Sequence, residues 1–121
     1  RGADLRGADL RGAEGFVSEE QEAETWAAVC RAVVASPERL RMQDWHGPGW
    51  RPEEPGACGT THCRAGWAQA LSTDPEIRRM DPESAGWRLL PRHGRLFYDM
   101  DSERVLNLCK AEVARLDAKD P

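Results

Sequence analysis

The clearest pattern along the chain is a set of apolar positions at helical spacing, separated by charged residues. Ser18 and Gln21 form a capping-box pair, which is typical of the start of a helix. Ser36-Pro37 predicts its end. Between these limits apolar residues recur at i, i+3, i+4 and i+7, at Ala23, Trp26, Ala27, Cys30, Val33 and Val34. The pattern therefore predicts an amphipathic helix.

A second clear helix is predicted a few residues after position 60. Thr60 or Thr61 can supply its N-cap. One face of it carries Cys63, Gly66, Trp67, Ala70 and Leu71. The glycine on that face would let another backbone approach closely. Residues 46–56 form a loop by composition. The stretch before this loop fits either a short helix or an extended segment, with apolar residues at Leu40, Met42 and Trp45.

Three more helices are predicted in the last third of the chain. Two of them begin where a capping side chain precedes a proline, at Asp74-Pro75 and Asp81-Pro82. The third is capped by Asp101 or Ser102, with inward positions at Val105, Leu106, Cys109, Val113 and Leu116. No segment after residue 15 predicts a strand.

The first fifteen residues repeat with a period of five, and read RGADL, RGADL and RGAEG. This pattern resembles the A(D/N)LXX repeat of bacterial pentapeptide-repeat proteins. In that family each repeat forms one side of a right-handed β-helix, with Ala and Leu pointing inward. Gly15 replaces the third Leu, which indicates that the solenoid ends there. The chain begins inside a repeat, so we expect it to be part of a longer protein.

Together these patterns predict a mainly α chain with two parts. Residues 1–15 would be the end of a pentapeptide-repeat solenoid, a right-handed β-helix. Residues 16–121 would form a helical domain of about four to five helices. A chain of 121 residues is long enough for one core.

Composition excludes several classes of function. The net charge of -4 argues against a general nucleic-acid or anionic-membrane binder. No apolar run approaches the roughly 20 residues that a membrane span needs. Cysteines are too sparse for a secreted disulfide scaffold, at Cys30, Cys58, Cys63 and Cys109. We therefore expect reduced cysteines, a cytoplasmic location and no cofactor.

The most unusual string is CGTTHCRAGWA, at residues 58–68. It resembles the pattern CGTxxCxAGWA of small bacterial and phage domains of unassigned function. In those domains a D-M-x-x-W-like segment precedes the string and an L-F-Y-like segment follows it. The matching segments here are residues 42–45 and 96–98, with a departure at Gln43-Asp44. The resemblance spans roughly residues 40–110 and implies a shared fold, without an activity.

The string admits four interpretations. The favoured one is structural: buried cysteines, a tight turn at Gly59 and threonine caps. A disulfide between Cys58 and Cys63 is compatible with the spacing. A zinc site would use Cys58, His62, Cys63 and His46 as ligands. A catalytic thiol would be Cys63 or Cys58, with His62 or His46 as its base.

Other side chains are candidates for surface binding. Trp45 and Trp50 flank the Gly/Pro-rich loop, where exposed aromatic contact is expected. An arginine-rich stretch could meet an acidic partner through Arg88, Arg92 and Arg95.

A solenoid end must be covered, because its last coil exposes apolar side chains and unpaired backbone groups. We therefore predict a non-enzymatic capping and protein-interaction module with a protein partner. The predicted helix after residue 16 could cover the end with Phe16, Val17 and Trp26. A small cysteine-dependent enzyme or redox domain and a structural zinc site are the alternatives. The sequence predicts no oligomeric state.

Overall fold

The computed structural model describes residues 17–54 and 60–119. These residues form α1 (Glu19–Ala35), the 3-10 helix η1 (Pro37–Arg39), α2 (Arg64–Leu71), α3 (Pro75–Arg79), α4 (Pro82–Leu89), the 3-10 helix η2 (Pro91–Tyr98) and α5 (Ser102–Lys119). The prediction of a mainly helical domain is confirmed for this part of the chain. The repeats at residues 1–15, Phe16 and Cys58 lie outside the described residues.

Local capping explains where most helices begin. The Ser18 side chain accepts a hydrogen bond from the Gln21 backbone, and the Gln21 side chain binds the Ser18 backbone in return. Carboxylates accept bonds from backbone N–H groups in the first turns of α3, α4 and α5, at Asp74, Asp81 and Asp101. These predicted starts are confirmed, as is the end of α1 before Pro37.

The predicted threonine cap of α2 is wrong. Cys63 is the N-cap, and its Sγ accepts a hydrogen bond from the Gly66 backbone at 3.3 Å. The residues before it are extended and pair with another extended segment through two isolated bridges, Leu40 with His62 and His46 with His62. Because these residues pair with distant backbone, α2 begins only at Arg64, after the predicted threonine caps.

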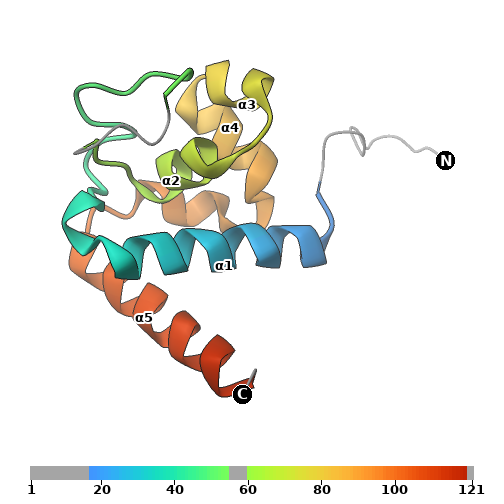
Figure 1. The fold of residues 1–121 in the computed structure, drawn as a ribbon, viewed down its shortest axis with the longest axis vertical. Coiled ribbons are helices and arrows are strands. Elements are labelled where there is room, and N and C mark those ends of the chain that lie inside the picture. The colour runs from blue at the N-terminus through green and yellow to red at the C-terminus, as the bar shows by residue number, and fades with distance from the viewer. Residues whose placement is uncertain (1–16, 55–59, 120–121) are drawn as a thin grey trace, which may run out of the picture.

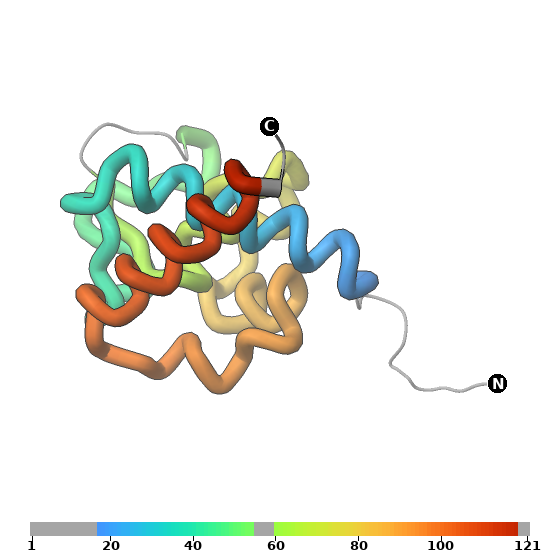
Figure 2. The backbone as a smooth tube through the Cα atoms, turned by 90° about the horizontal axis from the view of Figure 1, so that it is seen from below, coloured from blue at the N-terminus to red at the C-terminus, as the bar shows by residue number. Residues whose placement is uncertain are grey.

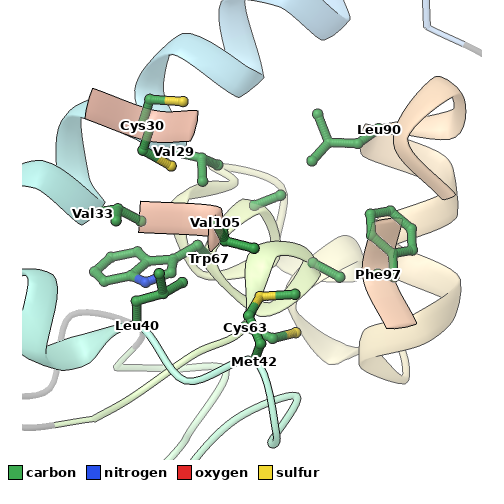
Figure 3. Close-up of a cluster of buried hydrophobic side chains, with 13 residues drawn as sticks. Val29, Cys30, Val33, Leu40, Met42, Cys63, Trp67, Leu90, Phe97 and Val105 are labelled. Atoms are coloured by element: carbon green, nitrogen blue, oxygen red, sulfur yellow. The ribbon is translucent and has the colours of Figure 1, made fainter. Parts of the chain in front are cut away.

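The helices pack on both sides of α1. Figure 1 shows α1 between α5 on one side and the group of α2, α3 and α4 on the other. Figure 2 shows α5 crossing α1 in the view from below. The core between them contains Val29 and Cys30 of α1, Trp67 of α2, and Leu90, Phe97 and Val105 from the C-terminal half (Figure 3).

Glycines allow the closest backbone approaches in this core. A Cβ at Gly66 would overlap the carbonyl oxygen of Trp45, so only glycine fits at this point of α2. The predicted close approach of a second backbone is confirmed. A Cβ at Gly86 would similarly press on Ala65, which allows α4 to pack closely on α2.

Leu71 lies at the surface, although its spacing predicts the inner face of α2. Leu71 and Trp87 are 41 % and 43 % exposed, whereas Glu22 is only 3 % exposed. Within the described ranges, no helix is long and apolar enough to cross a membrane.

Candidate functional site

The extended segment before α2 holds His62 in a fixed position. The His62 backbone N–H donates to Arg39 and its carbonyl accepts from Arg41, both at 2.8 Å. The neighbouring Gly47 N–H donates to Thr61 O, also at 2.8 Å. His62 is thus anchored between residues 39–41, at the end of η1, and the loop that carries His46.

Cys63 is a core residue that also forms part of the floor of a small pocket. Its side chain is 1 % exposed, and burial raises the pKa of the thiol, although the Gly66 N–H opposes that rise. A reactive cysteine needs both access and a lowered pKa. Cys63 is a free cysteine in this structure. The geometry therefore favours the structural interpretation of Cys63, and the roles predicted for Cys58 remain predictions.

His46, His62 and Gln69 form a buried hydrogen-bonded chain. The two histidine Nδ1 atoms are 2.7 Å apart, and His46 Nε2 lies 2.6 Å from Gln69 Oε1. The Gln69 amide nitrogen donates to three backbone carbonyls of the segment around α3, at Ile77, Arg78 and Met80. The chain thus links the loop, α2 and α3.

These contacts determine the protonation of the two rings. Gln69 Oε1 can only accept, so His46 Nε2 carries the proton and His46 Nδ1 accepts one. His62 Nδ1 is then the donor, which leaves His62 Nε2 as a bare lone pair. Burial lowers the pKa of both histidines, and that of His62 falls to about 3 with the help of His46 and Arg39. Both rings are therefore neutral near pH 7.

This arrangement favours structure over chemistry. His62 Nε2 has no hydrogen-bond partner among the described residues, but the residue is 0 % exposed and its ring lies 4.7 Å from that of Trp67. A general base must come within hydrogen-bond reach of its substrate. The described residues also contain no group of three His, Cys, Asp or Glu that could hold a metal ion. Neither the catalytic nor the zinc interpretation gains support here.

The two loop tryptophans have different surroundings. Trp50 is half-buried and stacks on His46, with ring centroids 3.8 Å apart and an interplanar angle of 4°. Trp45 is half-buried as well, and the binding role expected of both tryptophans stays a prediction. Trp45 lines a pocket of about 220 Å³ together with Met42, Cys63, Phe97, Tyr98 and Met100.

A partly exposed aromatic surface adjoins this pocket through Tyr98 and Met100, which also line it. We name it the aromatic face and define it as Trp45, Trp87, Tyr98 and Met100. The last three are 43 %, 51 % and 55 % exposed. The Trp45 and Tyr98 rings meet edge to face at 6.1 Å, and Trp87 Nε1 donates to the Tyr98 hydroxyl at 3.3 Å. Sequence analysis identified Trp45 alone. The signal for Trp87 is its position two residues from buried Ala85, on the opposite side of the helix.

The three predicted binding arginines do not share one role. Arg88 and Arg95 are exposed on α4 and η2. Arg92 instead binds the buried carboxylate of Glu22 through its side chain at 2.6 Å and its backbone N–H at 2.8 Å. Arg92 therefore ties η2 to α1, and its assignment to partner binding is not favoured.

Two buried charged residues were missed. Glu22 precedes Trp26 by four residues and Val29 by seven, so its spacing places it on the apolar face of α1. Arg64 is 1 % exposed. No periodic signal reveals it, because every residue from 64 to 70 is buried.

No protein-family model, curated protein or solved structure matches the chain. The interpretation of the site therefore depends on its own geometry.

Proposed function

We propose that this chain is a non-enzymatic protein-interaction module whose docking surface is the aromatic face. The observation that carries the proposal is the exposure of Trp87, Tyr98 and Met100 beside the pocket that Trp45 lines. Trp, Tyr and Met are enriched at the centres of protein interfaces. The pocket walls are mostly apolar and hold one titratable thiol, Cys63, whose pKa is raised, so this pocket suits binding better than catalysis.

Two side chains of the aromatic face, Trp87 and Tyr98, are held by contacts within the domain. One side of the Trp87 ring lies against Gly94, where a Cβ would overlap it, and Phe97 meets the ring edge to face at 5.8 Å. The Tyr98 hydroxyl donates to Glu83. Side chains that are already fixed lose little entropy on binding, which favours affinity.

The partner's chemistry follows from the walls and rim of the pocket. An aliphatic or aromatic side chain would fill the apolar pocket. Arg88 and Arg95 are exposed on the elements that carry Trp87 and Tyr98 but do not line the pocket, so their contact with an acidic partner stays a prediction.

The proposal extends to the rest of the chain. Residues 1–15 would be the last repeats of a pentapeptide-repeat β-helix, and the helical domain would cover their end in the cytoplasm. The repeat period and the reduced state of the buried cysteines Cys30, Cys63 and Cys109 support this placement. Trp26 is not available for covering the solenoid, because its ring packs on His93 and Arg64.

The test is affinity capture from extracts of the source cells, with a matched set of variants. The double variant Tyr98→Ser and Met100→Ser removes the apolar rim, and Leu71→Ser removes an equally exposed apolar side chain elsewhere. A protein retained by the wild type and by Leu71→Ser, but lost with the double variant, is the expected result. Equal retention by all three chains, with unchanged thermal stability, contradicts the proposal.

A further inference from the structure

A second pocket, separate from the aromatic face, lies where α1, the N-terminus of α2, η2 and α5 meet. Its volume is about 350 Å³, near the lower end of the range for small-molecule sites. Its walls include Trp26, Arg64, His93, Leu96, Leu108 and Ala111. The walls are mostly apolar apart from a few polar groups, which is the usual composition of a ligand site.

Arg64 is the unusual member of this pocket. It is 1 % exposed, and its Nε and Nη1 atoms are buried without a hydrogen-bond partner in the described part of the chain. Its guanidinium lies 4.8 Å from the centre of the Trp26 ring, a cation–π contact. A buried guanidinium with unsatisfied donors is costly, because the interior replaces neither its hydration nor its counter-ion.

The carboxylates around the pocket are already engaged. Glu112 accepts two hydrogen bonds from Arg115, at 3.0 and 2.6 Å. Glu22 accepts from Arg92 at 2.6 Å. Each carboxylate is thus balanced by another arginine, and Arg64 adds one uncompensated positive charge.

His93 adds a second unpartnered polar group. Its Nδ1 is buried without a partner among the residues that the structure describes. Burial and the nearby Arg64 lower the pKa of His93, so the ring is neutral near pH 7. His93 Nε2 lies 3.9 Å from a Glu22 carboxylate oxygen, so the neutral ring donates to an anion at Nδ1 only in the tautomer that carries its proton there.

Cys109 is the internal competitor for Arg64. Cys30 donates a hydrogen bond to it, and this bond together with Arg64 lowers the pKa of the Cys109 thiol. A Cys109 thiolate would neutralise Arg64 from inside the core. Even then, Nε and Nη1 of Arg64 would lack hydrogen-bond partners, because neither atom bonds to Cys109.

We propose that this pocket binds a small organic monoanion, a carboxylate on a compact apolar or aromatic body. The carboxylate would accept hydrogen bonds from Arg64 and His93 once the side chains that cover their buried nitrogens move aside. The body would lie among Trp26, Leu96 and Leu108. A single negative charge balances the positive charge of Arg64. A dianion would leave one negative charge without a positive partner in the pocket.

The experiment is a titration of the full chain, followed by the amide shifts of residues 91–98 and 108–115 in NMR spectra. The probes are benzoate, benzyl alcohol as its neutral counterpart, and phenyl phosphate as a dianion. We expect benzoate to bind at least tenfold more tightly than either of the other two, because hydrogen bonds to a charged group are the strong ones.

Variants identify the pocket. Arg64→Met should weaken benzoate binding at least tenfold, and its thermal unfolding shows whether it still folds. Ala111→Phe fills the mouth from an exposed position of α5 without touching Arg64, and should also abolish binding. Ala114→Phe is its matched control, since Ala114 is exposed on α5 and does not line the pocket.

Several results would overturn the proposal. Equal binding of benzyl alcohol and benzoate would mean an apolar cavity without an anion site. Tighter binding of phenyl phosphate would refute the monoanion. Absence of binding by every probe, or loss of binding in Ala114→Phe as well as in Ala111→Phe, would refute the pocket itself.

Discussion

Replacing Gln69 with methionine tests whether the buried polar chain supports the fold. Methionine has a similar size, so the change removes hydrogen bonds with little change in packing volume. The Gln69 side chain makes two donations at 2.8 Å, to Ile77 O and Met80 O, and accepts one bond at 2.6 Å from His46. At about 1 kcal/mol for each bond, with an additional penalty for buried carbonyls left unpaired, Gln69→Met should cost about 3 to 4 kcal/mol of unfolding free energy.

The assay is urea unfolding followed by circular dichroism, with native-state hydrogen exchange of the α3 amides. Gln43→Met is the matched control, because Gln43 is exposed and its amide donates one bond at 2.8 Å to Met100 O. It should cost only about 0.5 kcal/mol, as is usual for surface positions. A loss below about 1 kcal/mol for Gln69→Met, or equal losses in the two variants, would refute the reasoning.

The remaining predictions concern protonation and thiol access. The pKa of His62 is about 3 in the fold and 6.5 as a free group, so the unfolded chain binds more protons between these values. The stability from the neutral ring is complete above pH 6.5 and is lost as the pH falls toward 3, with about 2 kcal/mol lost by pH 5 from this group alone. Urea midpoints between pH 7.5 and 5 measure this loss. In a Cys58→Ser variant, Cys63 should react with a thiol reagent at least on the order of a hundredfold more slowly in the fold than in urea, because labelling requires opening of the core.

Controls separate these effects from general ones. Between pH 7.5 and 5 the pH stays above the usual pKa values of Asp and Glu. Protonation of carboxylates therefore contributes little to the loss of stability in this range. Stability that stays constant from pH 7.5 to 5 would contradict the neutral histidine pair. Rapid native labelling of Cys63, slowed by His62→Gln, would contradict the structural role of this cysteine and revive the cysteine-dependent enzyme.

Local sequence was sufficient wherever a helix start depends on adjacent residues. The Ser18 capping box and the caps before Pro75 and Pro82 act within three or four positions, so the boundaries of α1, α3 and α4 follow from the chain alone. The helical period likewise places Val33 and Cys109 in the core.

The sequence identified some residues of the candidate site but not the contacts between them. The unusual composition of residues 58–68 drew attention to His62 and Cys63, and His46 was identified as their possible neighbour. Sequence does not reveal that His46 Nε2 binds Gln69, or that Thr60 precedes an extended segment instead of capping α2. The first is a side-chain bond between residues 23 positions apart, and the second depends on backbone bonds to distant residues, such as the one from His62 N to Arg39 O.

The sequence by itself determined the helices, their caps and most of the core, because these depend on the periodicity and hydrogen bonding of neighbouring residues. Only the tertiary structure decided that the Arg64 side chain is buried. Arg64 is enclosed because α1, η2 and α5 converge on it, and Trp87 is exposed because the small residues Ala85 and Gly86 take the inner face of α4. The burial of Arg64 is set by the meeting of distant segments and no local pattern encodes it, whereas helical spacing already signals the burial of Glu22 and the exposure of Trp87.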